Sequence, residues 1–163
     1  MRIDSSGNVG IGTATTSAAQ LTIAGSSSVS ALKVPNIEEV ATVSATAATG
    51  TINYDITTQS VLYYTSNASA NWTVNFRGSS GTSLNTLMQT GESMSVSFLV
   101  TQGATAYYNS SVQVDGTTSG VTTKWQGSAP TSGNASSLDS YTYVIIKTAN
   151  ATFTVLATQT KFA

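Results

Sequence analysis

The chain has 163 residues and a formal net charge of −1. Only 8% of its residues are charged, against about 25% in ordinary soluble domains. Its six lysines and arginines are scattered and form no basic cluster, so we expect no nucleic-acid partner. No apolar run approaches the roughly 20 residues of a membrane span, so we expect no membrane insertion. Serine and threonine make up about a third of the sequence, so hydroxyl groups rather than ions should keep the surface hydrated, even in salt.

The chain contains neither cysteine nor histidine. This excludes disulfides, thiol nucleophiles, imidazole metal ligands and histidine-based triads. Seven carboxylates remain, and a glycosidase would need two of them flanking a cleft. Glu38 and Glu39 are neighbours that point apart in an extended chain, Asp115 lies in a turn signal, and Glu92 follows a predicted helix end. No calcium-loop pattern occurs. We therefore predict no catalytic residues, no metal site and no cofactor.

Residues 1–24 predict a short strand, a turn and further strands. The dipeptide Gly7-Asn8 suits the positive φ angles of a tight turn. In the strand that follows, glycine alternates with bulky residues, so one face is bare and lets another backbone approach closely. Such a segment cannot bury a core alone, and we expect it to form a stalk by packing against copies of itself. The expected stalk contacts are Gly7, Asn8, Val9, Gly10, Ile11 and Gly12.

The chain between this element and residue 51 has a weaker pattern. Residues 13–19 are small and polar, as in a loop, and Leu21 and Ile23 alternate around Thr22 as in another short strand. Residues 25–50 are rich in serine, alanine and threonine, and Pro35 disfavours a long helix there. We expect residues 25–50 to be an extended linker.

Residues 51–163 predict an all-β domain, because short runs of alternating apolar and polar residues recur between turns rich in Gly, Asn and Ser. Asp115-Gly116 indicates a turn that pairs the strand around Val112 and Val114 with the strand that ends at Trp125. We predict an antiparallel β-sandwich resembling a jelly roll. The expected strands centre on residues 52–56, 61–64, 72–76, 94–100, 112–114, 121–125, 141–146 and 153–157.

Residues 82–91 interrupt the β pattern. Leu84, Leu87 and Met88 have helical spacing, Thr82 or Ser83 can cap the start, and Gly91 lies where a C-terminal cap is common. We predict one short helix that closes an end of the sandwich.

Aromatic side chains are the main candidates for ligand binding. Six of them are candidates for stacking on sugar rings at an exposed loop or rim: Tyr63, Tyr64, Tyr107, Tyr108, Trp125 and Tyr141. However, Tyr63, Tyr64 and Tyr141 lie in predicted strands, and we expect these three in the core instead. By contrast, turn signals flank Tyr107 and Tyr108, and Trp125 and Gln126 lead into a loop. We therefore predict that Tyr107, Tyr108, Trp125 and Gln126 contact a ligand at the surface.

Two parts of the sequence resemble bacteriophage proteins. Residues 2–13 resemble the R-I-x-x-x-G-N-V-G-I-G-T element of phage tail fibres and related fibrous virion proteins, in which three chains wrap around one axis. Much of the remainder resembles a domain of virion structural proteins from marine cyanophages and pelagiphages, which is mostly described as structural or tail-fibre-like. The runs that carry the second resemblance are residues 74–78, 84–88, 91–100, 103–108, 124–127, 133–136 and 153–157.

The resemblance implies a homotrimer on the surface of a virion, in contact with other virion proteins. Residues 1–24 would form the stalk, residues 25–50 the linker and residues 51–163 a knob. We expect a tail fibre or spike that adheres to a glycan or protein on the bacterial host surface. The alternative is a capsid head fibre or decoration protein, and a polysaccharide depolymerase ranks third because carboxylates are sparse.

Overall fold

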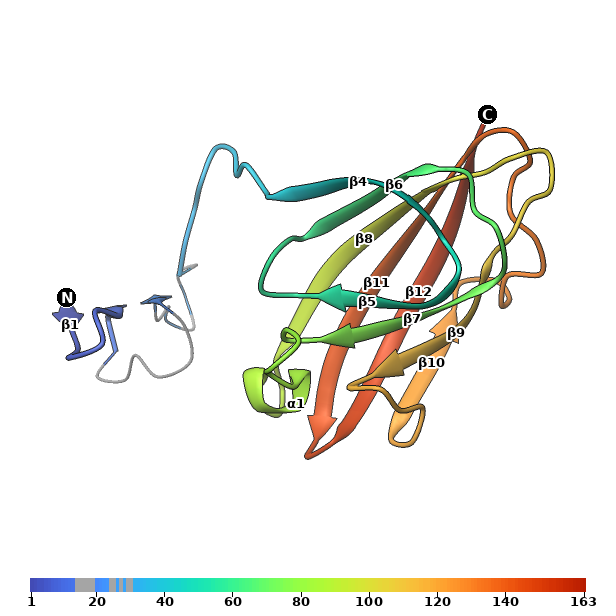
Figure 1. The fold of residues 1–163 in the computed structure, drawn as a ribbon. Coiled ribbons are helices and arrows are strands. Elements are labelled where there is room, and N and C mark those ends of the chain that lie inside the picture. The colour runs from blue at the N-terminus through green and yellow to red at the C-terminus, as the bar shows by residue number, and fades with distance from the viewer. Residues whose placement is uncertain (14–19, 24–25, 27, 29–30) are drawn as a thin grey trace. The chain divides into compact units, whose positions relative to one another are not determined.

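The computed structural model describes residues 1–163 except 14–19, 24–25, 27 and 29–30, and it is nearly all β (Figure 1). The chain divides into two compact units, Met1–Glu38 and Glu39–Ala163. Strand β4 (Ala41–Ala47) already belongs to the large sheet of the second unit. The second unit therefore begins about a dozen residues before the predicted boundary at residue 51, because small residues such as alanine, serine and threonine form β4 without a strong apolar signal.

The first unit contains a small sheet of three strands, β1 (Arg2–Ile3), β2 (Val9–Ile11) and β3 (Leu21–Ile23). β2 lies in the middle, antiparallel to β1 and parallel to β3. The turn between β1 and β2 uses Gly7 at a φ of 82°, which confirms the predicted turn, and β3 confirms the strand predicted at Leu21–Ile23. The predicted loop at residues 13–19 falls almost wholly outside the described residues.

The second unit contains two facing sheets (Figure 1). The larger has the strand order β10-β12-β11-β8-β6-β4, and the smaller has the order β5-β7-β9. The strands that follow β4 are β5 (Gly50–Asp55), β6 (Val61–Ser66), β7 (Trp72–Arg77), β8 (Ser93–Thr101), β9 (Asn109–Val114), β10 (Val121–Trp125), β11 (Leu138–Ala149) and β12 (Thr152–Phe162).

From β4 to β9 the chain winds as a coil, because each successive strand joins the opposite sheet. As a result β4, β6 and β8 are parallel in the large sheet, and β5, β7 and β9 are parallel in the small one. The predicted antiparallel jelly roll is therefore wrong for these strands, since a jelly roll consists of antiparallel strands. Antiparallel pairing in this unit joins β11 to β8 and to β12. Alternation of apolar residues reveals which face of a strand is buried, but it carries no information on strand direction.

Equivalent residues stack along the coil in the small sheet. The parallel register aligns Ile52 with Val74 in the core and Asn53 with Asn75 on the other face. The Asn75 side-chain amide donates to Asn53 Oδ1 at 2.8 Å, and Asn75 Oδ1 accepts from the Gly116 amide at 2.7 Å. The sequence carries this repeat, since residues 51–55 (T-I-N-Y-D) and 73–77 (T-V-N-F-R) have the same pattern.

The predicted turn at Asp115-Gly116 is confirmed, but the hairpin built on it is not. Asp115 and Gly116 have φ angles of 51° and 81°, and Val114 and Thr117 exchange backbone hydrogen bonds across the turn. However, β9 pairs with β7 in the small sheet, whereas β10 runs parallel to β12 and forms the edge of the large sheet opposite β4. The turn therefore changes the direction of the chain as it leaves the small sheet, and the two strands on either side of it are not hydrogen-bonded to each other.

The predicted helix is α1 (Leu84–Leu87), and the Ser83 hydroxyl caps its start by accepting from the Thr86 amide. The expected cap at Gly91 is wrong, because the helix ends at Met88 in an extended conformation. Instead, Lys147 Nζ donates to the carbonyl oxygens of Asn85, at 2.5 Å, and Met88, at 2.8 Å. A cation from β11 therefore satisfies carbonyl groups at the C-terminal end of the helix.

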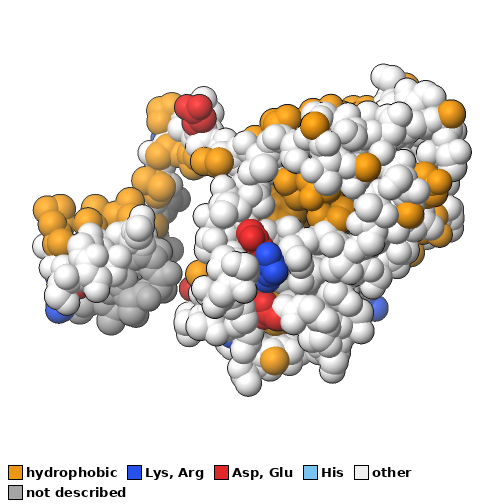
Figure 2. Space-filling view, viewed as in Figure 1, with side chains coloured by type: hydrophobic (Ala, Val, Ile, Leu, Met, Phe, Trp, Pro, Cys, Tyr) orange, Lys and Arg blue, Asp and Glu red, His pale blue; other side chains and the backbone are white. Residues whose placement is uncertain are grey.

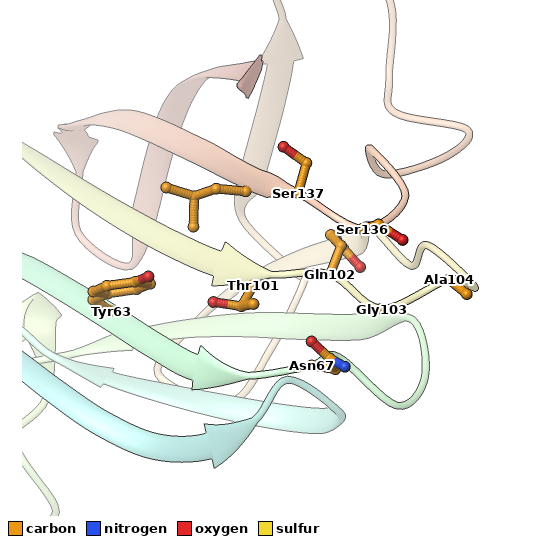
Figure 3. A pocket seen from close by; sticks show the side chains of 9 residues that line it. Tyr63, Asn67, Thr101, Gln102, Gly103, Ala104, Ser136 and Ser137 are labelled. Atoms are coloured by element: carbon orange, nitrogen blue, oxygen red, sulfur yellow. The ribbon is translucent and has the colours of Figure 1, made fainter. Parts of the chain in front are cut away.

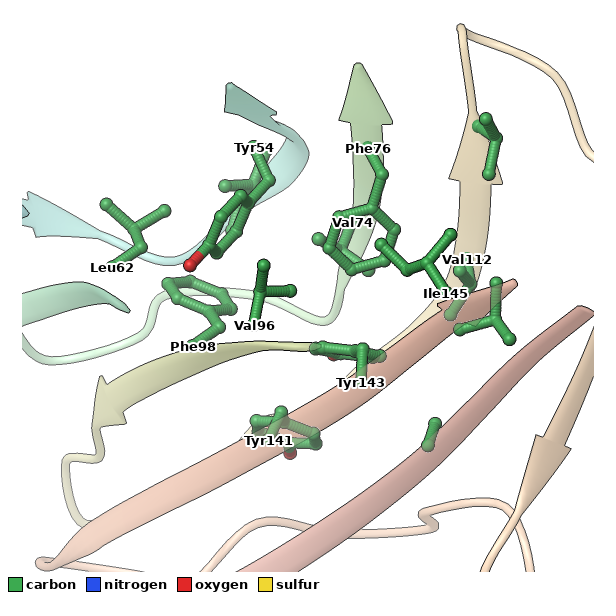
Figure 4. Packing of buried hydrophobic residues seen from close by; sticks show 14 of the residues in the cluster. Tyr54, Leu62, Val74, Phe76, Val96, Phe98, Val112, Tyr141, Tyr143 and Ile145 are labelled. Atoms are coloured by element: carbon green, nitrogen blue, oxygen red, sulfur yellow. The ribbon is translucent and has the colours of Figure 1, made fainter. Parts of the chain in front are cut away.

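The core between the two sheets is rich in aromatic rings (Figure 4). The ring of Trp72 contacts those of Phe98 and Tyr141 edge to face, with centroids 6.0 and 5.4 Å apart. Phe76 and Tyr143 pack in the same way at 4.9 Å. These rings are completely or almost completely buried, so the second unit has a core of its own.

Candidate functional site

A cavity of about 560 Å³ lies at one end of the large sheet (Figure 3). β6 supplies Tyr63 and the end of β8 supplies Thr101, whose Cα pairs with that of Leu138 on β11. Short loops complete the wall. The lining residues are Tyr63, Asn67, Thr101, Gln102, Gly103, Ala104, Ser136, Ser137 and Leu138.

A buried hydrogen-bond network fixes the loops beside this cavity. The Gln102 side chain donates to the Tyr107 carbonyl oxygen at 2.6 Å and accepts from the Tyr107 amide at 3.0 Å, which holds the loop after β8. It also donates to Asp139 Oδ2 at 2.9 Å, and the Asn134 amide donates to the same oxygen at 3.0 Å. Gln102 and Asp139 are 2% and 0% exposed, so the loops before and after them are joined below the surface.

Gly133 is required by this network. A Cβ atom at Gly133 would overlap the Tyr107 carbonyl oxygen and would lie 2.6 Å from Gln102 Nε2 and 2.7 Å from Asp139 Oδ2. Only glycine therefore allows the loop that contains Gly133 to approach the network so closely.

The cavity lining combines polar and apolar groups and carries no charged side chain. Asn67 and Ser136 place an amide and a hydroxyl at its wall, and Tyr63 adds a half-buried aromatic ring. The Thr101 hydroxyl is buried and has no hydrogen-bond partner among the described residues. Ser136 has a φ of 54°, and its amide donates to the Gly103 carbonyl oxygen at 2.8 Å, which joins the two loops of the wall. The site can therefore offer hydrogen bonds and one apolar face to a neutral ligand.

Three charged groups elsewhere in the second unit, Arg77, Asp55 and Asp115, have structural partners. Arg77 forms an ion pair with Asp55 across β5 and β7, with 2.5 Å between Nε and Oδ1, and this hydrogen bond raises the pKa of Arg77. The Asp115 carboxylate accepts from the amides of Leu84, at 2.6 Å, and Asn85, at 2.9 Å, at the start of α1. Figure 2 shows how sparse charged side chains are on the face in view.

Burial raises the pKa of three core tyrosines. All three are fully buried, and loss of hydration disfavours the charged phenolate. The Tyr54 hydroxyl donates to the carbonyl oxygens of Ser60, at 2.7 Å, and Ser97, at 3.1 Å. These tyrosines are therefore neutral packing residues at ordinary pH.

The predicted ligand contacts do not line the large cavity. Tyr107 and Tyr108 are half-buried in the loop between β8 and β9, and Tyr107 packs against the core. Trp125 ends β10, and its ring contacts those of Tyr141 and Tyr143. Trp125 and the exposed Gln126 line a separate cavity of about 320 Å³ with Lys124, Leu156, Ala157 and Thr158. Ligand binding by these four residues stays a prediction.

Sequence reasoning favoured the core over a surface site for Tyr63, and it missed the Gln102–Asp139 network. Tyr63 was expected in the core, but it lies on the outer face of the large sheet, aligned with Val43 and Leu99. Tyr141 is buried as expected, and Tyr64 is half-buried against Phe98. One sequence signal was available, since Asp139 shares a strand face with Tyr141 and Tyr143 and is thus an acidic residue on an apolar face.

The comparisons with known proteins give no assignment: no family model matches the chain, and no curated protein or solved structure shows significant similarity to it. Within the described residues, no cluster of three or more acidic side chains is placed to hold a metal ion. No helix in that part of the chain is long and apolar enough to cross a membrane.

Proposed function

We propose that this protein is a phage virion structural protein, the knob and stalk of a tail fibre or spike that adheres to the bacterial host surface as a homotrimer. The observation that carries the proposal is the contrast between an N-terminal unit with exposed apolar side chains and a second unit with its own core. Such a pair suits an assembly segment joined to a binding domain.

The N-terminal unit supports self-association. Ile3, Ile11 and Leu21 lie on its three strands and are 61%, 42% and 54% exposed. Gly10, in the middle strand, is buried, as expected for a position where backbones approach closely. Three strands of two or three residues cannot cover these side chains, so other copies of the segment are the natural partners. The resemblance of residues 2–13 to the phage fibre element favours three copies.

The second unit supports a binding role. Its preformed polar cavity and sparse surface charge suit weak contacts with a neutral surface polymer in salt water. Three such knobs on one particle would bind the host surface together, so weak single sites would give strong attachment through avidity.

A capsid head fibre or decoration protein is the second candidate. Leu32, Val34, Ile37 and Val40 precede β4 and are 57%, 42%, 63% and 65% exposed. A neighbouring virion protein could cover this apolar segment. A depolymerase has less support, because Asp55, Asp115 and Glu92 accept hydrogen bonds that stabilise the fold.

Immunogold labelling of intact virions with antibody to residues 39–163 tests the proposal. We expect gold on the tail or its fibres, and we expect the purified protein to compete with virions for adsorption to host cells. Gold distributed over the head would favour the decoration protein. Absence of the protein from purified virions would overturn both candidates.

A further inference from the structure

We infer that the cavity beside Tyr63 binds a neutral sugar residue of a polysaccharide. The inference rests on the proposed adhesive function and names the class of ligand for it. It also moves the expected binding site from Tyr107, Tyr108 and Trp125 to the outer face of the large sheet (Figure 3).

The size and composition of the cavity fit a sugar ring. The cavity is shallow and open to solvent, and its volume of about 560 Å³ has room for a sugar ring. A pyranose has an apolar face of C–H groups and a rim of hydroxyl groups. Tyr63 offers an aromatic face for the first, and Asn67 and Ser136 offer an amide and a hydroxyl for the second.

The uncharged lining restricts the ligand further. Phosphate, carboxylate and sulfate groups are usually bound by Arg or Lys, and cations by carboxylates, but the lining has none of these side chains. The absence of charged side chains from the lining favours neutral sugars over acidic ones.

The Gln102–Asp139 network makes the site rigid. Both side chains are buried, and their hydrogen bonds hold the loops that carry Gly103, Ala104 and Ser136. The Ala68 amide donates to the Thr101 carbonyl oxygen at 2.9 Å, which holds the loop that carries Asn67 against β8. Rigid loops lose little conformational entropy when a ligand binds, so even a shallow site can be selective.

Saturation-transfer NMR and calorimetry on the full chain test this inference. The probes are neutral oligosaccharides of glucose, galactose, mannose and N-acetylglucosamine, with oligogalacturonate as the acidic comparison. We expect at least one neutral probe to bind and Tyr63→Ala to weaken its binding about tenfold through loss of ring contact. Tyr63→Phe should retain most of the affinity. The control Thr90→Ala should leave it unchanged, because Thr90 is exposed and precedes the start of β8, whereas the cavity lies at the end of that strand.

Thermal melting will show whether each variant is folded. If Tyr63→Ala fails to fold, Asn67→Ala replaces it, because Asn67 is exposed and contributes only the rim amide. The inference would be overturned if no neutral probe bound or if oligogalacturonate bound more strongly than the neutral probes. It would also be overturned if the wild type and the folded cavity variant bound a neutral probe with equal affinity. Competition for host adsorption without saccharide binding would overturn the sugar site and leave the adhesin. If the protein bound a saccharide but were absent from the virion, the sugar site would stand and the proposed adhesin function would be overturned.

Discussion

The two units of this chain use the same kind of residues in different ways. In the N-terminal unit, apolar side chains such as Ile3 and Leu21 remain mostly exposed on very short strands. In the second unit, rings such as Trp72 and Tyr143 are enclosed between two sheets. A β-strand has no stability of its own. The second unit has two sheets that cover each other, whereas the described residues of the first unit form one small sheet. We expect the first unit to depend on other copies and the second to fold independently.

The largest expected effect is alkaline unfolding of the second unit. Burial raises the pKa of Tyr54, Tyr141 and Tyr143 above the unfolded value of about 10. Below about pH 10 these tyrosines are neutral in both states, and their contribution to stability is complete. At higher pH the unfolded chain loses protons first, so stability should fall. The measurement is the melting temperature of the second unit from pH 7 to 12. Above pH 10, Tyr143→Phe should make the fall of the melting temperature with pH less steep. An equally steep fall in this variant would contradict the prediction.

Truncation of the core should have the next largest effect. Trp72→Ala removes a ring that is 1% exposed and contacts Phe98 and Tyr141, so we expect a loss of about 3–5 kcal/mol in the free energy of unfolding. Urea denaturation provides the measurement. Ile3→Ala is the matched control, because Ile3 is an exposed residue of the N-terminal sheet. It should change the free energy of unfolding of the second unit by less than about 0.5 kcal/mol. Similar losses in both variants would show that the two units unfold together.

Removal of the buried cation should have an intermediate effect. Lys147→Met keeps much of the side-chain length but leaves the Asn85 and Met88 carbonyl oxygens without this donor, and we expect a loss of about 2–3 kcal/mol. The control is Lys124→Met, which alters an exposed lysine on β10. If the two variants were equally stable in urea, the hydrogen bonds from Lys147 to the end of α1 would not stabilise the second unit.

Deletion of residues 1–38 should have the smallest effect on stability. Because the second unit has its own core, we expect its melting temperature to shift by no more than a few degrees. Light scattering should show a trimer for the full chain and a monomer for residues 39–163. A trimer that persists after the deletion would place the assembly contacts in the second unit.

Much of the second unit could be predicted from its sequence. Alternation identified the strands from β5 to β12, and the spacing of Leu84, Leu87 and Met88 identified α1. β4 was missed because its apolar residues are mostly alanine, which gives a weak periodic signal. The direction of the strands was missed because parallel and antiparallel strands bury the same alternating face. The stacked repeat of residues 51–55 and 73–77 was the available sign of a parallel coil.

For the candidate site, too, some features follow from the sequence and others only from the tertiary structure. Sequence by itself determined a sparsely charged, hydroxyl-rich β protein without histidine or cysteine, because composition fixes which chemical groups exist. Only the tertiary structure decided that Tyr63 faces outward and that Gln102 meets Asp139, since these residues come from different strands and loops. Local patterns specify which face of a strand is buried. Which distant side chains share a cavity depends on how the sheets are ordered, and that order is set by packing of the whole chain.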